Sequence, residues 1–116
     1  MKSTLLLFLT IAAIAASSCK KDKRPPNLAE AFRYSETACS DPWVNDIERG
    51  NPSFARQLEK WLETKTGAEI TTPFRKMYPE KTQLCYACSC TTGNVIYVWP
   101  PAGSEQKFID LGFTRP

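Results

Sequence analysis

Four cysteines carry the most specific chemistry in this chain of 116 residues: Cys39, Cys85, Cys88 and Cys90. An even number of cysteines in a small domain from an oxidising compartment indicates two disulfide bonds. A bond between Cys88 and Cys90 would close a strained ring, so two pairings stay open. Either Cys39 bonds Cys88 while Cys85 bonds Cys90, or Cys39 bonds Cys90 while Cys85 bonds Cys88. Both pairings close a loop of about 50 residues, which is worth about 4 kcal/mol in the chain-entropy model.

The same cysteines allow two other functions. The spacing Cys85-x-x-Cys88 matches thiol oxidoreductases, which need a thiolate stabilised by a helix N-terminus or a positive charge. Residues 85–88 carry no charge, and a turn and a strand are expected after them. Four cysteines can also hold Zn²⁺ tetrahedrally, but the two matched cysteine pairs of a strong zinc motif are missing. We predict structural disulfides, with a redox protein using Cys85 and Cys88, or a cysteine-based metal binder, as alternatives.

The sequence gives little support for hydrolysis, phosphate binding or nucleic-acid binding. The chain contains no histidine, which excludes Ser-His-Asp and Cys-His hydrolases. Its five glycines are isolated, so no glycine-rich phosphate loop is present. The net charge of +3 is slight, and no basic patch with interleaved aromatics indicates nucleic acid as a partner. The sequence predicts no enzyme activity, no cofactor and no resident metal.

The segment Trp99-Pro100-Pro101 is the strongest sequence candidate for contact with a partner. Tryptophan is favoured at binding hot spots, and prolines restrict the conformations of a loop. The alternative is that Trp99 packs in the core.

A fifth cysteine, Cys19, ends a segment that is typical of export. Lys2 precedes an apolar run over residues 5–16, and small residues follow. This pattern is that of a secretory signal, and Cys19 directly after Ala16-Ser17-Ser18 resembles the lipobox of bacterial lipoproteins. The resemblance implies that residues 1–18 are removed and that Cys19 is acylated, for example by palmitate. An uncleaved anchor and a plain signal peptide are the alternatives, but the run is shorter than the 20 or so residues of a spanning helix.

Lipidation would attach the protein to a membrane of the cell envelope, which we expect to be the outer membrane. Residues 19–31 are then the lipidated cysteine and a flexible tether, because they are rich in charge and contain Pro25-Pro26. Residues 32–116 are enough for one small domain.

Helical periodicity is clearest over residues 54–66. Phe54, Leu58 and Leu62 fall on one face of a helix together with Trp61, and Gly67 suits the position after the helix. Asp41 followed by Pro42 predicts an earlier short helix that ends at Arg49. A last short helix is expected to follow Ser104.

Strand signals place a short strand at residues 68–72, a loop at 74–81, and a hairpin from strands at 84–90 and 95–99 with a turn at 91–94. Alternation along a flat strand puts Cys85 on the face opposite Cys88 and Cys90, so the first hairpin strand begins later if Cys85 bonds either of them. The expected fold class is α+β: a small antiparallel sheet of a hairpin plus a short strand, packed by one amphipathic helix, with a short C-terminal helix and disulfide staples.

The segments Cys39-Ser40-Asp41-Pro42-Trp43 and Cys85-x-x-Cys88-x-Cys90-x-x-Gly93, with a closing Leu111-Gly112-Phe113, resemble a set of small uncharacterised lipoproteins of Bacteroidota. The resemblance covers about residues 36–113 and is most specific at the clustered cysteines. It implies an envelope lipoprotein and implies no activity. We therefore expect a non-enzymatic binding or accessory module that is held to the membrane by the lipid on Cys19 and meets an envelope protein.

Mass spectrometry of the protein from its native membrane tests these assignments. We expect acyl mass on Cys19, no alkylation before reduction, and alkylation of Cys39, Cys85, Cys88 and Cys90 after reduction. Alkylation before reduction would show free thiols and would favour redox or metal chemistry.

Overall fold

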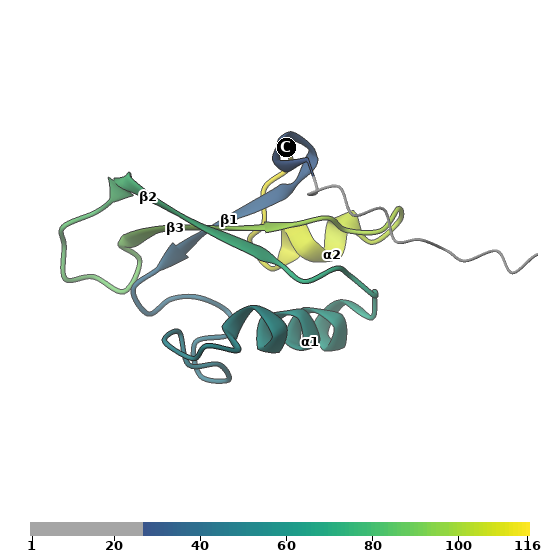
Figure 1. The fold of residues 1–116 in the computed structure, drawn as a ribbon, viewed down its shortest axis with the longest axis horizontal. Coiled ribbons are helices and arrows are strands. Elements are labelled where there is room, and N and C mark those ends of the chain that lie inside the picture. The colour runs from purple at the N-terminus through teal and green to yellow at the C-terminus, as the bar shows by residue number, and fades with distance from the viewer. Residues whose placement is uncertain (1–26) are drawn as a thin grey trace, which may run out of the picture.

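The computed structural model describes residues 27–116, so the signal segment, Cys19 and most of the expected tether lie outside the described residues. The domain has the predicted α+β fold (Figure 1). No helix within residues 27–116 has both the length and the apolar character that crossing a membrane requires. The elements in chain order are a 3₁₀ helix η1 (Leu28–Glu30), β1 (Phe32–Thr37), α1 (Phe54–Thr66), β2 (Phe74–Thr82), β3 (Thr91–Val98) and α2 (Glu105–Asp110).

The sheet is antiparallel and has the strand order β1-β3-β2. Its central strand, β3, contains the run Val95-Ile96-Tyr97-Val98, all of it buried, which suits a strand paired on both sides. Phe32 pairs with Val98 at one end of β1, and Thr37 pairs with Thr91 at the other. The ladder between β2 and β3 shifts register between Met77 and Thr82, and Pro79 lies in this irregular part, where a proline is tolerated.

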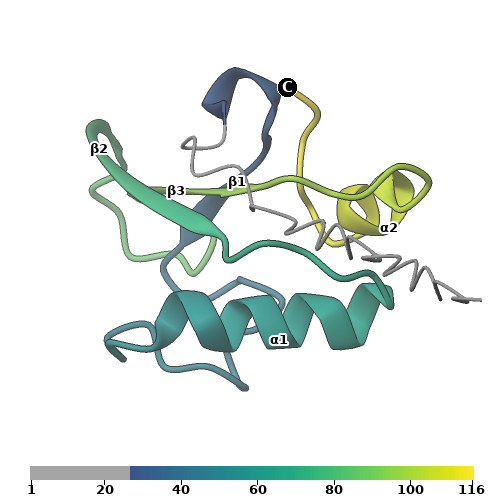
Figure 2. The same cartoon turned by 45° about the vertical axis from the view of Figure 1, so that its right-hand side comes forward.

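The helix at residues 54–66 is confirmed as α1. It buries Phe54, Leu58 and Leu62, and it ends at Gly67, whose φ of 69° is left-handed. The helices α1 and α2 lie on the same face of the sheet, whereas η1 lies on the opposite side (Figure 2). The main core fills the space between this face and the two helices.

Trp43 lies at the centre of that core with 2% of its surface exposed. Its ring contacts those of Tyr34 and Trp61 at centroid distances of 4.8 and 5.8 Å. The helix predicted between Asp41 and Arg49 is wrong: the segment makes turns, with the Ile47 amide bonded to the Trp43 carbonyl. Burial of Trp43 and Ile47 from a short segment holds these turns in place of a helix.

Four further assignments from the sequence are also wrong: two strands, a loop and a turn. Residues 68–72 form no strand, because they lie along α1: the Ile70 amide bonds Glu63, and the Thr72 hydroxyl bonds Glu59. Residues 74–81, expected as a loop, belong to β2, an edge strand that tolerates charges and a proline facing water. Residues 84–90 form the connection between β2 and β3, and the turn expected at 91–94 is part of β3.

The other face of the sheet has a smaller apolar cluster of Ala31, Val95 and Tyr97. Leu28, Tyr78 and Trp99 pack against it. Residues 27–31, which the sequence assigns to the tether, include η1 and the fully buried Ala31. No helix other than η1 covers this face in the part of the chain that the structure describes.

Gly93 is the position at which the sheet requires glycine most strongly. Its φ is 94°, and an added Cβ would lie 2.5 Å from the Thr82 hydroxyl and 2.8 Å from the Tyr78 carbonyl. We expect Gly93→Ala to lower the free energy of unfolding by about 3 kcal/mol, from backbone strain plus overpacking. Gly103 has a similar φ of 88° and open space around it, so Gly103→Ala is the control and should lower that free energy by about 1 kcal/mol. Equal losses in urea denaturation would show that the contacts at Gly93 are not limiting.

Candidate functional site

A buried carboxylate organises the end of the sheet nearest the cysteines. Glu36 of β1 is fully buried and faces two arginines. Its Oε2 lies 2.7 Å from Arg75 Nη2 of β2, and its Oε1 lies 3.1 Å from Arg49 Nε. Thr92 and Asn94 of β3 each donate a hydrogen bond of 3.1 Å to Oε1. One side chain therefore links all three strands to the segment that carries Arg49, because a buried charge requires such partners.

Arg49 extends this network to the residues that follow β1. Its Nη2 donates to the backbone carbonyls of Thr37 and Ala38 and lies 4.0 Å from an Asp41 carboxylate oxygen. Charge-assisted bonds of this kind are stronger than neutral ones. They hold residues 37–49 against the sheet, and Cys39 lies inside that segment.

Asp41, which the sequence places at the start of a short helix, instead bonds the end of β1. Its Oδ1 accepts from the amide and hydroxyl of Thr37 at 2.8 and 2.7 Å, and from the Tyr34 hydroxyl at 3.0 Å. Burial and then the charge of Asp41 raise the pKa of Tyr34 well above its ordinary value. Tyr34 is therefore a neutral donor at physiological pH, and Asp41 closes the turn after β1.

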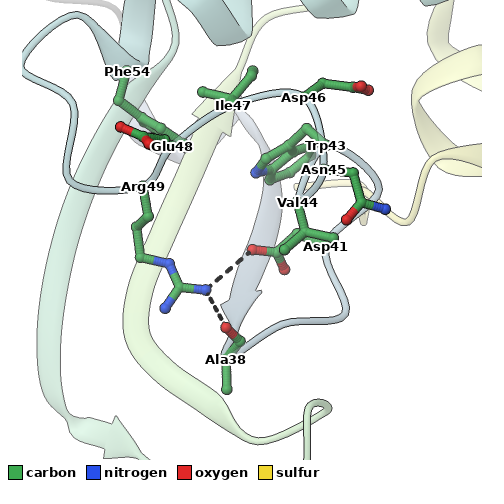
Figure 3. Close-up of a pocket in the computed structure, with 10 residues that line it drawn as sticks. All are labelled: Ala38, Asp41, Trp43, Val44, Asn45, Asp46, Ile47, Glu48, Arg49 and Phe54. Carbon is green, nitrogen blue, oxygen red and sulfur yellow. Dashed lines mark hydrogen bonds and ion pairs between the residues drawn. The ribbon is translucent and has the colours of Figure 1, made fainter.

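A pocket of about 320 Å³ opens beside this network, lined mainly by residues 41–49 (Figure 3). In Figure 3 the Arg49 guanidinium reaches the Asp41 carboxylate and the Ala38 carbonyl. Asp46 at the rim accepts a hydrogen bond of 2.8 Å from the indole of Trp61. Three charged groups of the pocket, those of Asp41, Asp46 and Arg49, are thus already engaged within the protein.

The four clustered cysteines form two disulfides, Cys39–Cys88 and Cys85–Cys90. This is one of the two pairings that the sequence left open, and it joins Cys39 to the C-terminal half. The first bond spans 49 residues and the second spans 5. Both fasten residues 83–90, which we call the disulfide loop.

Backbone hydrogen bonds hold the disulfide loop at its base and along β1. The Gln83 amide donates to the Thr91 carbonyl at 3.0 Å, which closes the neck of the loop. The Ala38 amide bonds the Cys90 carbonyl at 2.8 Å, and the Cys39 amide bonds the Cys88 carbonyl at 3.1 Å. The loop is consequently fixed on both sides, by its neck and by the extension of β1.

Two apolar side chains project from this fixed loop into solvent. Leu84 is 98% exposed and Tyr86 is 109% exposed, more than any other large hydrophobic residue described. Cys90 is buried, so the loop has an inner and an outer side. An exposed aliphatic and an exposed aromatic residue on a rigid loop are typical of a contact surface for another protein. The disulfide loop is therefore the candidate functional site.

The residues Trp99, Pro100 and Pro101 have contacts within the domain. The Trp99 indole donates a hydrogen bond of 3.1 Å to the Asn27 carbonyl, and its ring packs beside the smaller cluster. Pro100 is half-buried, and the Pro101 carbonyl accepts from the Ser104 amide and hydroxyl where α2 begins. These contacts give the segment an intramolecular role, and its contact with a partner stays a prediction.

Sequence reasoning missed Leu84 and Tyr86 as exposed residues, because it placed them in a strand. The signal that points to the loop is the position of Cys85, whose bond to Cys90 cannot be made across a flat strand. It also missed the pairing of Glu36 with Arg49 and Arg75, for which no spacing in the sequence gives a signal.

The pairing of the cysteines bears on the two alternative functions. A Cys-x-x-Cys redox pair requires a bond between Cys85 and Cys88, and here each of them bonds another cysteine. A tetrahedral cysteine site requires four thiolates, and all four sulfurs are in disulfides. Within residues 27–116 no group of three or more His, Cys, Asp or Glu is placed to hold a metal ion.

Comparison with known proteins adds no relative: no family model matches the sequence, and no curated protein and no solved structure is significantly similar to it. Function therefore has to be inferred from the geometry of this chain.

The buried charge network can be tested by Glu36→Gln. We expect the free energy of unfolding to fall by about 3 kcal/mol, because Arg49 and Arg75 lose the charge that compensates them. The control, Glu80→Gln, alters an exposed carboxylate of β2 and should change stability by less than about 0.5 kcal/mol. A small effect of Glu36→Gln in urea denaturation would contradict an organising role for this carboxylate.

Proposed function

We propose that this chain is a membrane-anchored envelope lipoprotein whose folded domain is a non-enzymatic binding module for a protein partner. The anchor is the lipid on Cys19, and the contact surface is the disulfide loop. The observation that carries the proposal is the exposure of Leu84 and Tyr86 on a loop that two disulfides hold in one conformation.

The direction of the strands separates the loop from the anchor. Phe32 at the start of β1 lies opposite Val98, so Asn27 is at that end of the sheet. The disulfide loop joins Thr82 to Thr91 at the other end (Figure 1). The eight residues of β3 between the two ends span about 26 Å at the usual rise of a strand. A lipid on Cys19 therefore leaves the loop free for a partner.

The energetics of the loop also favour binding. Ordering a flexible loop on association costs affinity, and the crosslinks and hydrogen bonds of this loop remove most of that cost beforehand. Full burial of a leucine-sized side chain contributes about 2 kcal/mol. Tyrosine adds a large contact area with few rotatable bonds. Leu84 and Tyr86 can thus supply the centre of a small protein interface.

Site-specific photocrosslinking in the native envelope tests the proposal. With p-benzoylphenylalanine in place of Tyr86 we expect one crosslinked protein, and with the same group in place of Gln106, an exposed residue of α2, we expect none. The crosslinked protein, once purified, should bind the double variant Leu84→Ser, Tyr86→Ser at least about tenfold more weakly than the parent chain.

Both side chains are fully exposed, so the double variant should unfold at the same urea concentration as the parent chain. Absence of an adduct at position 86, an equal adduct at position 106, or unchanged affinity of the double variant would each overturn the loop as the binding surface.

A further inference from the structure

The face of the sheet opposite α1 carries a set of basic and aromatic side chains. Register places Arg33, Tyr97 and Phe74 in one row across the three strands, and Lys76 beside Val95 in the next row. Directly paired residues of an antiparallel sheet point to the same side. Tyr78 belongs to this side as well, because its hydroxyl lies 2.6 Å from that of Tyr97. We call this surface, defined by Arg33, Phe74, Lys76, Tyr78 and Lys81, the basic face.

Its charged groups point to solvent around the aromatic rings. Arg33, Lys76 and Lys81 are all exposed, and Phe74 is 47% exposed. The ammonium groups of Lys76 and Lys81 lie 4.9 and 4.8 Å from the centre of the Tyr78 ring. No ion pair joins these three cations to an acidic residue within residues 27–116. The positive charge of this surface is therefore available to an anionic partner.

The anchored segment enters the domain on the same side. Trp99 follows Tyr97 at the spacing of alternate strand residues, and its indole bonds the Asn27 carbonyl. Seven residues lie between Cys19 and Asn27, so the eight steps from one Cα to the other span at most about 28 Å. A lipid on Cys19 therefore keeps this face within about the length of the sheet from the membrane.

The charge of the connecting segment argues against that segment as the occupant of the basic face. Between Cys19 and Asn27 the chain has Lys20, Lys21, Lys23 and Arg24 against the single acid Asp22. Like charges disfavour its packing on Arg33, Lys76 and Lys81. The connecting segment and the basic face instead attract the same anionic partner.

We propose that the basic face lies on the anionic phospholipid surface of the membrane that holds the lipid of Cys19, a proposal that rests on the lipoprotein assignment. Each Lys or Arg close to such a surface strengthens its binding about fivefold. The exposed ring of Phe74 and the partly buried ring of Tyr78 suit the interfacial region, where aromatic side chains gather. In this orientation α1 and the pocket beside Arg49 face away from the membrane, and the disulfide loop lies at its side.

Lysine labelling of the full lipidated chain on vesicles tests this orientation. The protein is reconstituted on phosphatidylcholine vesicles and on phosphatidylglycerol vesicles, acetylated briefly, and digested for mass spectrometry. We expect acetylation of Lys76 and Lys81 to slow about fivefold on phosphatidylglycerol and to recover in 1 M salt, at which the Debye length is about 3 Å. Lys60 and Lys65, exposed on α1, serve as internal controls and should react equally on both vesicles.

Charge-reversed chains complete the test. The double variant Arg33→Glu, Lys76→Glu leaves Lys81 as the reporter, and the acetylation of Lys81 should then be equally fast on both lipids. The matched control Lys60→Glu, Lys65→Glu changes the charge equally on the opposite side of the sheet and should keep the protection of Lys76 and Lys81.

Flotation of the same samples separates the two proposals. A chain that floats with phosphatidylcholine vesicles is anchored by its lipid, whatever the labelling shows, and a chain that does not float overturns the anchor. Equal acetylation of Lys76, Lys81 and the α1 lysines on phosphatidylglycerol overturns the membrane orientation alone. Protection of Lys76 and Lys81 in native membranes but not on phosphatidylglycerol also overturns it, and assigns the basic face to an acidic protein.

Discussion

The Glu36 carboxylate is the constraint on which the rest of this domain depends. A fully buried charge is tolerated only if its neighbours compensate it, and here the compensation comes from three other parts of the chain. Arg75 of β2 and Arg49 of the segment after β1 form ion pairs with Glu36, and Thr92 and Asn94 of β3 donate hydrogen bonds to it. The same contacts fix the positions of Cys39 and of the neck of the disulfide loop. A small domain with a modest core thereby gains a defined arrangement of its strands, which apolar packing alone specifies less sharply.

Secondary structure was predicted best where it depends only on the residues of one segment. The periodicity of Phe54, Leu58 and Leu62 is a local property, so α1 could be predicted with its end at Gly67. The strands depend on partners far along the chain. β2 contains Pro79 and several charged residues, a composition that is typical of a loop. The same composition is compatible with an edge strand, but the sequence does not show that β2 lies at an edge. β1 was missed for a similar reason, because its alternation includes Glu36, a residue that is buried only through arginines 13 and 39 positions away.

The candidate site likewise has features that the sequence predicts and features that depend on distant parts of the chain. The number of cysteines predicted two disulfides, and a spacing argument narrowed the pairings to two. The face on which each cysteine would lie already indicated that residues near Cys85 could not continue a flat strand. The exposure of Leu84 and Tyr86 could not be predicted, because it follows from where the neck of the loop closes between Gln83 and Thr91. The two proposals use different parts of the domain: the membrane orientation rests on the basic face, and the partner contact rests on the disulfide loop.

The order of the cysteines along the chain has a consequence for biogenesis. Cys39–Cys88 and Cys85–Cys90 are interleaved: Cys85 lies between Cys39 and Cys88 in the sequence, and its partner Cys90 lies after Cys88. If these four thiols were oxidised in the order in which they emerge, Cys39 would first join Cys85, and the native pairs would then require exchange through mixed disulfides. The native pairs form directly only when β1 and β3 have already brought Cys39 next to Cys88. Production of this protein in an oxidising compartment therefore depends on isomerase activity, or on oxidation slow enough to follow the folding of the sheet.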